Sequence, residues 1–307
     1  MKTKAEKKTP SRLGRASQKY YWAMVIPGML LVLIFQYGPM FGIVMAFQDY
    51  IPAKGILGSN WVGLKHFKSM IALPDTGRIL RNTLIISFGK IFGTMIVAVA
   101  FAIMLNEIRI KWLKKWTQTI VYLPHFLSWV ILAGIVKNIL DMDGLLNTLL
   151  NNLGIQGLNF FGSNKLFQPM VIGTGIWKEF GYSSVIYLAA LTSVDAGLHE
   201  AAALDGANWW QRVWHVTLPG ILPVVLVVAA MNVGRVLNAG FDQVYNLYSP
   251  LVFETGDIID TYVYRIGLIG RRFSFGTAVG LMKSIIGLVL MVGMNEFCKK
   301  FANRRIF

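Results

Sequence analysis

The residue patterns that come closest to known reactive sites are all incomplete. His199 and Glu200 begin the pattern of a zinc-protease helix, but Ala203 occupies the position of the second histidine ligand. Gly89 and Lys90 resemble the end of a phosphate-binding loop, yet isoleucine follows where that loop needs serine or threonine. The sequence therefore predicts that this chain has no ATPase site of its own, no catalytic residues, no metal site and no cofactor.

A second pattern is complete, and it predicts binding rather than catalysis. A charged, alanine-rich stretch, 200–206, lies between two long apolar runs and is followed by Val216–Pro219. Lipid offers such a stretch no partner, so we expect a protein outside the bilayer to grip it. Alanines allow close docking, Glu200 offers a charge, and Gly206 permits a tight turn. The residues expected to make this contact are Glu200, Ala201, Ala202, Asp205, Gly206, Leu218 and Pro219.

The composition places these residues in a membrane protein. Of 307 residues, 55% are hydrophobic and 15% are charged, and the mean hydropathy is +0.53. The net charge of +15 does not indicate nucleic-acid binding, because the lysines and arginines gather at the ends of the apolar runs. The single cysteine, Cys298, excludes an internal disulfide, and no Cys/His cluster has zinc spacing.

Six apolar windows are long enough to cross about 30 Å of hydrocarbon as helices. We therefore expect an all-α membrane protein with six transmembrane helices in one permease domain, residues 21–297. The predicted spans are Tyr21–Phe47, Asn82–Leu105, Thr117–Leu140, Phe167–Leu191, Leu218–Leu237 and Thr277–Phe297.

Three basic segments set the expected orientation. They are the N-terminal segment 1–20, the connection 106–116 and the tail 298–307. By the positive-inside rule all three are cytoplasmic, which places both termini and the loop 192–217 on that side. The first apolar run is too long for a signal-peptide core and is expected to remain as a span. The outward segments 49–79, 141–166 and 238–276 could form a structured cap or plain connecting loops.

Polar residues within the spans suggest a path for a solute. Asn232, Arg235 and Asn238 recur at i, i+3 spacing and would form one polar stripe on the fifth span. Aromatic residues of the fourth span could hold sugars by stacking, or could serve only in packing. Lys178 is expected near the outer interface, where it would snorkel. The full candidate path comprises Asn232, Arg235, Asn238, Asp242, Gln243, Tyr245, Trp177, Tyr182 and Tyr187.

The complete motif resembles a known family signature. The order Glu-Ala-Ala, three residues, Gly, nine residues, an aliphatic residue, any residue, Leu-Pro is similar to the cytoplasmic EAA motif of permease subunits in bacterial binding-protein-dependent ABC importers. Val216 stands where isoleucine is usual. The flanks Leu188–Leu191 and Asp205–Ala207 resemble the carbohydrate branch of the maltose-permease type. Tyr37–Met40, Phe47–Tyr50 and Trp61–Leu64 resemble the oligosaccharide and polysaccharide permease group, so the resemblance covers nearly the whole chain.

This resemblance implies a type I ABC importer permease fold in the bacterial cytoplasmic membrane. It implies a second, commonly nonidentical permease subunit, two ATPase subunits that use ATP and Mg²⁺, an external solute-binding protein and a sugar substrate. The segment 200–206 would be the coupling helix that sits in a cleft of the ATPase, and transport would proceed by alternating access. Membrane lipid is the only other expected partner, and nucleic acid is not one.

Other functions remain open from the sequence. Arg235 leaves room for a glycerol phosphate or an acidic sugar as the solute. An intramembrane enzyme would need a nucleophile and a base in one cavity. A structural scaffold without transport would leave the cytoplasmic motif unexplained.

Overall fold

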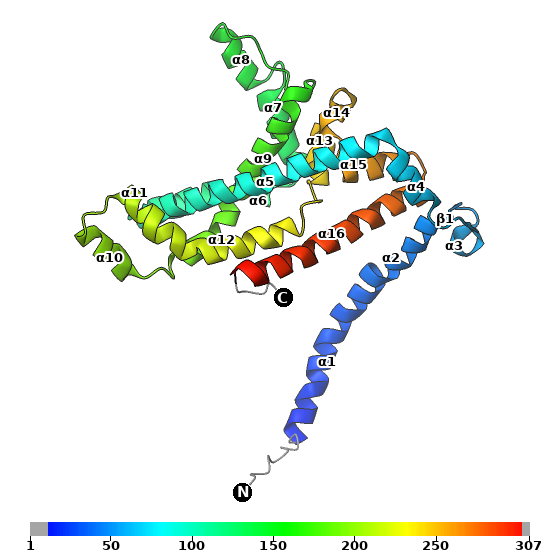
Figure 1. Ribbon diagram of the computed structural model, residues 1–307, viewed down its shortest axis with the longest axis horizontal. Coiled ribbons are helices and arrows are strands. Elements are labelled where there is room, and N and C mark those ends of the chain that lie inside the picture. Colours follow the sequence, from blue (N-terminus) through cyan, green and yellow to red (C-terminus); the bar gives the residue numbers. More distant parts are fainter. Residues whose placement is uncertain (1–11, 303–307) are drawn as a thin grey trace.

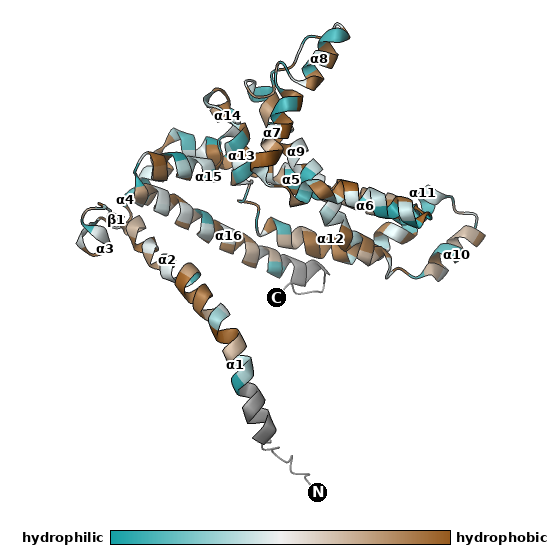
Figure 2. Cartoon of the chain, turned by 180° about the vertical axis from the view of Figure 1, so that it is seen from behind, coloured by the Kyte–Doolittle hydropathy of each residue, from teal (hydrophilic) through white to brown (hydrophobic). Residues whose placement is uncertain are grey.

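The first apolar run forms one continuous helical rod, which stands apart from the rest of the molecule up to Met40 and packs against the last long helix at its end (Figure 1). It passes through α1 (Arg12–Val32), a π-helical turn η1 (Leu33–Tyr37), α2 (Gly38–Met40) and a 3₁₀ segment η2 (Phe41–Phe47). The π-helical turn lies just before Pro39, whose ring nitrogen cannot donate a helix bond. Figure 2 shows the rod as largely apolar, and its large side chains are exposed. Its surface is therefore available to lipid or to another subunit.

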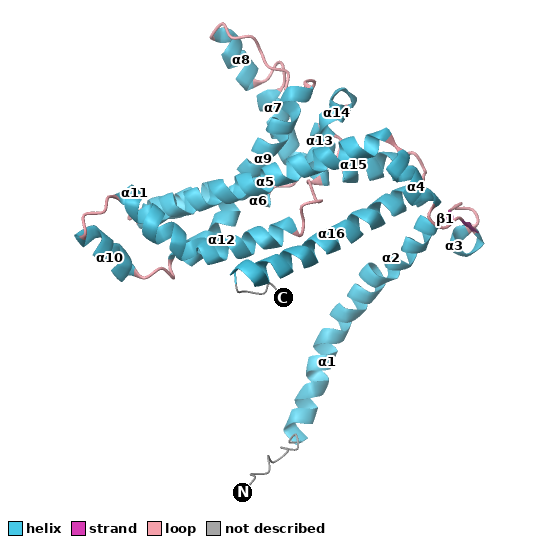
Figure 3. Ribbon diagram, viewed as in Figure 1, coloured by secondary structure: helices cyan, strands magenta, loops and turns pink. Residues whose placement is uncertain are grey.

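The computed structural model describes the backbone of residues 12–302 and the side chains of residues 19–296. The predicted N-terminal segment 1–20 lies outside the described side chains except for its last two residues, and the tail 298–307 lies outside them entirely. The elements after the rod are mainly helical (Figure 3). In chain order they are β1 (Gln48–Asp49), α3 (Gly55–Gly58), β2 (Asn60–Trp61), α4 (Lys65–Ala72), α5 (Pro74–Glu107), α6 (Lys111–Phe126), α7 (Trp129–Leu140), α8 (Leu145–Asn152), α9 (Asn164–Leu191), α10 (Ala196–Leu204), α11 (Trp209–Arg212), η3 (Val213–Thr217), α12 (Leu218–Val233), α13 (Phe241–Leu247), η4 (Pro250–Val252), α14 (Phe253–Gly256), α15 (Ile259–Tyr262), η5 (Val263–Ile269) and α16 (Phe273–Ala302).

Helices α5 and α9 form the central pair of the body. Gly89 and Gly93 on α5 face Ile172 and Ile176 on α9, and a Cβ at either glycine would lie within 2.6 or 2.3 Å of those side chains. The two helices can approach this closely only because neither glycine has a side chain. Three clusters of buried apolar residues lie around α5. Two of them include α9, one together with α7 and α13 and one together with η3 and α12, and the third joins α5 to α15 and α16.

The predicted third span is not one straight helix. Helix α6 ends at Phe126, and the chain bends by 106° before it continues through α7 and α8. Pro124 lies in the last turn of α6, and the Ser128 hydroxyl accepts a hydrogen bond from the Ile131 amide to begin α7. The expectation of an uninterrupted span over Thr117–Leu140 was therefore wrong.

The helix at the predicted fifth span begins and ends earlier in the chain than expected. Helical structure starts at Trp209, continues through the π-helical turn η3, and ends with α12 at Val233 rather than at Leu237. Pro219 is the second residue of α12, but the helical stretch as a whole already begins at Trp209 and passes through the π-helical turn before it. The sixth predicted span lies within α16, as expected.

In the part of the chain that the structure describes, four helical segments are long and apolar enough to cross a membrane, or up to five if the bent pair counts as one span. They are Lys19–Phe47, Pro74–Glu107, Trp209–Val233 and Phe273–Glu296, with the bent pair at Lys111–Asn152. Helix α9 covers the predicted fourth span with 28 residues, about 42 Å, but is not among them. The count of six spans and the placement of both termini stay predictions.

The segments predicted to face outward are folded. Strands β1 and β2 pair in antiparallel fashion, Gln48 with Trp61 and Asp49 with Asn60, so the chain is not wholly helical. The Tyr50 amide donates to the Ser274 hydroxyl at 2.8 Å and ties this hairpin to α16. Plain connecting loops are therefore ruled out for this hairpin.

A buried carboxylate organises the third predicted outward segment, 238–276. Asp257 pairs with Arg265 and accepts a hydrogen bond from Thr261, while its carbonyl accepts one from the Asn82 amide of α5. Burial raises the pKa of the Asp257 carboxyl, and the bond from Thr261 and the charge of Arg265 oppose that rise. These contacts fix 253–265 on the end of the α5–α9 pair.

Candidate functional site

The alanine-rich stretch forms the short helix α10, which lies at one end of the molecule beyond the ends of the long helices (Figure 1). The helix spans Ala196–Leu204, so it begins four residues before Glu200 and ends before Gly206. The Asp195 side chain accepts a hydrogen bond from the Gly197 amide and caps the helix start. The bounds predicted for this helix, 200–206, therefore need correction.

Gly206 ends α10 with a complete two-bond cap. Its φ is +82°, its amide donates to the Ala203 carbonyl at 3.1 Å, and the Ala207 amide donates to the Ala202 carbonyl at 2.9 Å. This is the Schellman arrangement, which favours glycine at the left-handed position. The predicted tight turn at Gly206 is confirmed. Asn208 and Gln211 then form a capping box that starts α11.

The surface of α10 is open to a partner. Glu200, Ala201 and Asp205 are exposed, Ala202 is partly exposed, and Leu204 is 90% exposed. A fully exposed leucine beside alanines is the kind of apolar surface that a protein partner covers. Leu218 and Pro219 are placed differently, because they line an apolar cavity of about 610 Å³ between α5, α11 and α12. The motif therefore divides into an exposed helix and a part that lies within the candidate span Trp209–Val233.

The polar stripe of the fifth span lies at the end of α12 rather than along a helix. Helix α12 ends at Val233, and Arg235 and Asn238 follow in successive turns, with the Arg235 amide bonded to the Asn232 carbonyl at 2.9 Å and the Asn238 amide to the Arg235 carbonyl at 2.8 Å. Both side chains are exposed, and Asn232 is half-buried. The expected helical stripe was wrong, but the three residues still occur at one break in the helix.

Buried polar contacts hold this break in place. The Lys90 Nζ donates to the Ala239 carbonyl at 2.6 Å. The Gln243 amide donates to the Val171 carbonyl at 2.7 Å and to the Thr174 hydroxyl at 2.9 Å. Gln243 is therefore buried between α13 and α9, and it supports the break instead of facing an open path.

Two further residues of the predicted solute path, Asp242 and Tyr245, lie on α13, where Tyr245 belongs to an aromatic cluster. Tyr245 packs against Phe241 at 5.2 Å and Tyr264 at 5.0 Å between ring centres, and 41% of Tyr245 is exposed. Asp242 is exposed on the first turn of α13. Both residues remain accessible to a solute, and their role in a path stays a prediction.

The three aromatic residues predicted on the fourth span do not share one environment. Trp177 and Tyr182 are exposed on α9, whereas Tyr187 is 1% exposed and packs within the cluster that α9 shares with α5 and α12. Tyr187 is therefore a packing residue in this structure. The predicted sugar platform narrows to Trp177 and Tyr182.

Tyr182 belongs to a polar and aromatic group at the α6–α7 bend. Its ring stacks on His125 at 4.1 Å with 4° between the planes, and the His125 Nδ1 lies 2.8 Å from the Glu179 carboxylate. Lys178 is buried, and its Nζ donates to the carbonyls of Pro124, His125 and Leu127 at 3.1, 2.7 and 2.8 Å. A cation at these last carbonyls of α6 caps the helix where the chain bends.

Sequence reasoning misplaced Lys178 and assigned no role to His125 or Glu179. Lys178 was expected to snorkel at the outer interface, but it lies inside the molecule on the end of α6. The available signal was Pro124 next to His125 in an apolar run, which indicates a break that needs capping. Within the described residues, no group of three or more His, Cys, Asp or Glu side chains could hold a metal ion.

Comparisons with known proteins agree with this arrangement. The chain is 43% identical over 305 residues to "Polygalacturonan/rhamnogalacturonan transport system permease protein YteP" of Bacillus subtilis (strain 168), covering 99% of this chain and 95% of that protein. It is 40% identical to "Protein LplB" of the same organism, covering 94% and 91%.

A solved structure has the same fold. It is a chain of a bacterial ABC transporter involved in the import of the acidic polysaccharide alginate, with a TM-score of 0.84 and 36% identity, covering 95% of this chain and 99% of that one. A second structure of the alginate transporter, in complex with an alginate pentasaccharide-bound periplasmic protein, matches with the same TM-score and 35% identity. Residues 95–301 match the family described as binding-protein-dependent transport system inner membrane component. This chain belongs to that family of permease subunits.

Proposed function

We propose that this chain forms the membrane-spanning path of an ATP-driven importer for an oligosaccharide. The observation that carries the proposal is helix α10, which is capped at both ends, contains the family's signature residues and has no buried residue. The relatives named for polygalacturonan, rhamnogalacturonan and alginate support a saccharide as the solute.

The energy source lies outside this chain in the proposal. An ATPase subunit that binds ATP and Mg²⁺ would receive α10 in a cleft, with Glu200 as the charged contact and the alanines as the close-packing face. Helix α10 joins α9 through four residues, 192–195, so a displacement of α10 would act directly on the helix that holds the α6–α7 bend. Through this connection a movement of α10 would reorient the membrane-spanning helices, as alternating access requires.

A second permease subunit completes the path in the proposal. The projecting part of the rod, 19–40, has large apolar side chains that are exposed along their whole length, which is the condition of a helix that packs on another membrane subunit (Figure 2). The half-exposed polar group at His125, Glu179 and Tyr182 would likewise be costly against lipid, so it would face the path between the two subunits.

A solute-binding protein would deliver the sugar to the folded outer segments, and the whole assembly would lie in the bacterial cytoplasmic membrane. The complex of a similar transporter with a periplasmic protein supports this arrangement. The similar transporter imports the acidic polysaccharide alginate, and Arg235 of this chain is exposed. Of the two alternative solutes, an acidic sugar is therefore favoured over a glycerol phosphate.

The test is reconstitution of the assembled importer in vesicles with its ATPase and binding protein. We expect ATP-dependent uptake of a radiolabelled saccharide from a panel of neutral and acidic oligosaccharides, and ATPase activity stimulated by the loaded binding protein. If the assembly takes up no saccharide but does accumulate glycerol phosphate, the oligosaccharide assignment fails. If this chain purifies with no ATPase, the importer assignment fails.

A further inference from the structure

A polar cavity lies beside the end of α12, between that end and α16. Its volume is about 460 Å³, within the range of roughly 300–1,000 Å³ typical of small-molecule sites. The polar side chains that line it are Arg235, Asn238, Asp260, Lys283 and Ser284. Such a lining is costly in a membrane-spanning body unless water or a polar solute fills the space.

The cavity carries one positive charge in excess. Lys283 Nζ and Asp260 Oδ1 form an ion pair at 2.5 Å, and the Ser284 hydroxyl donates to the Gly280 carbonyl at 3.0 Å. Among the residues that the structure describes, the Arg235 guanidinium and the Asn238 side-chain amide have no hydrogen-bond or ionic partner. Two free donor groups, one of them charged, therefore line the same cavity.

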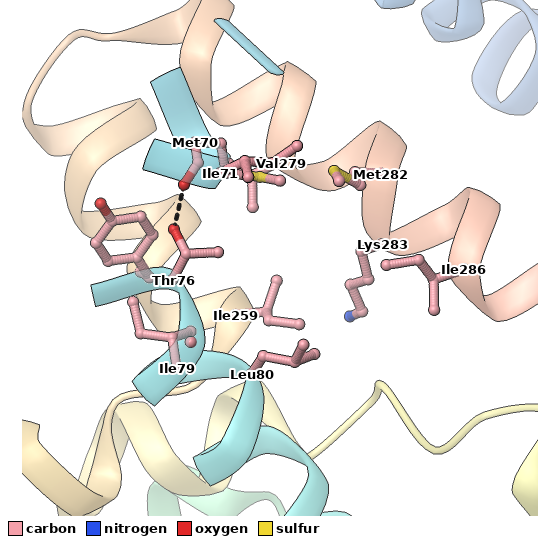
Figure 4. A pocket seen from close by; sticks show the side chains of 12 residues that line it. Met70, Ile71, Thr76, Ile79, Leu80, Ile259, Val279, Met282, Lys283 and Ile286 are labelled. Carbon is pink, nitrogen blue, oxygen red and sulfur yellow. Dashed lines mark hydrogen bonds between the residues drawn. The ribbon is translucent and has the colours of Figure 1, made fainter. Parts of the chain in front are cut away.

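Packing against apolar side chains fixes the position of Lys283, the second cation of the cavity. Lys283 also lines a neighbouring apolar cavity of about 340 Å³, where Met282 and Ile286 lie beside its alkyl stem (Figure 4). The stem occupies the apolar side while the ammonium reaches Asp260. Lys283 is thus fixed at the border of the two cavities.

The cavity lies between the end of α12 that is farther from α10 and the middle of α16, where its lining runs from Gly280 to Met291. Arg235 follows α12, whose 16 residues rise about 24 Å from the end nearest α10. Lys283 lies ten residues after Phe273, the first residue of α16, which is about 15 Å along that helix. A solute that enters from the side of the predicted outward segments would pass these two cations on its way across the spans.

We propose that this cavity binds the carboxylate of an acidic sugar unit. The planar Arg235 guanidinium would take the two carboxylate oxygens in a bidentate pair, the Asn238 amide would donate to a ring hydroxyl or carboxylate oxygen, and the Lys283–Asp260 pair would supply the second cation. This inference rests on the proposed function, and it names acidic saccharides as the substrate class and Arg235 as the residue that discriminates them.

The experiment measures equilibrium binding to the purified, assembled importer in the absence of binding protein, by ligand-observed NMR. The probes are trigalacturonate and its fully methyl-esterified form, which has the same sugar rings without the charges. We expect wild type to bind the acid at least about 10-fold more tightly than the ester, and Arg235→Gln to weaken acid binding about 10- to 100-fold with little change for the ester. Arg235→Lys should retain only part of the preference, because it keeps the charge but cannot form the bidentate pair.

Lys54→Gln is the matched control, because Lys54 is exposed near the hairpin and lies outside the cavity; it should bind both probes as wild type does. Asp260→Asn should strengthen acid binding, since Asp260 is the only carboxylate among the described residues that line the cavity. The proposal is overturned if wild type binds neither probe, if it binds both equally, or if Arg235→Gln keeps the preference for the acid. Saccharide uptake by the wild-type importer, measured separately, would survive each of these results, so failure of the site and failure of the proposed function remain distinct.

Discussion

Helix α10 and the break after α12 contrast in how their polar residues are held. In α10 the capping contacts come from within about ten residues of the chain, and the functional surface is exposed. At the break, Lys90 and Gln243 provide the support through contacts with residues 149 and 72 positions away. A site built from local contacts can be recognised by its motif, whereas a site built from distant contacts cannot.

The largest expected effect separates the buried from the exposed aromatic residues of α9. Tyr187→Ala should destabilise the subunit by about 3–5 kcal/mol, because it empties a buried position in the cluster with α5 and α12. Tyr182→Ala, on the same helix, should leave stability nearly unchanged and lower uptake. Thermal unfolding of the purified complex and vesicle uptake measure the two effects. Equal loss of stability in both variants would contradict the division.

The next effect tests the support at the α6–α7 bend. Lys178→Met removes three charge-assisted hydrogen bonds to the end of α6 and should lower the free energy of unfolding by about 2–3 kcal/mol. Lys178→Arg should recover part of this loss. The matched control is Lys137→Met, since Lys137 is exposed on α7 and should show little change in thermal unfolding. A Lys178→Met protein as stable as that control would show that the cap is dispensable.

A smaller effect on stability, but a specific one on transport, is expected at Gly206. A branched residue at a φ of +82° costs about 1–2 kcal/mol or more, while nothing lies within 4 Å of a Cβ there. Gly206→Val should therefore preserve insertion but reduce ATP-driven uptake by about tenfold or more. Gly206→Asn should retain more uptake, because asparagine tolerates this conformation. Identical uptake in the two variants would remove backbone strain as the cause.

The smallest effect lies in the outer hairpin. The hydrogen bond and charge of Lys65, with His66 nearby, hold the pKa of the Asp49 carboxyl below its usual value. Because the folded-state pKa is lowered, this contribution is present above about pH 4 and is lost as the pH falls through the folded-state pKa. For an exposed pair it should be well under about 1 kcal/mol. Unfolding followed from pH 7 to pH 3 should show a slightly shallower loss in Asp49→Asn than in wild type, and parallel curves would contradict the assignment.

The sequence predicted the membrane class, most apolar helices and the turn at Gly206, because these depend on local composition and spacing. It did not predict the bend at Phe126, the end of α12 at Val233 or the burial of Lys178. Each of these depends on which distant carbonyls or side chains meet a polar group inside the fold. Tyr187 and Tyr182 show the same limit, since two tyrosines five residues apart on one helix differ only in what packs against them.

The central claim is that α10 is the contact of this chain with a separate ATPase. The most direct test places a single cysteine in the helix, Ala201→Cys in a Cys298→Ser background, and measures cross-linking to the ATPase subunit in the assembled importer. Leu57→Cys is the control, because Leu57 is fully exposed on the outer hairpin. The account predicts an ATPase cross-link from position 201 and none from position 57; no cross-link from position 201, or equal cross-linking from both, would contradict it.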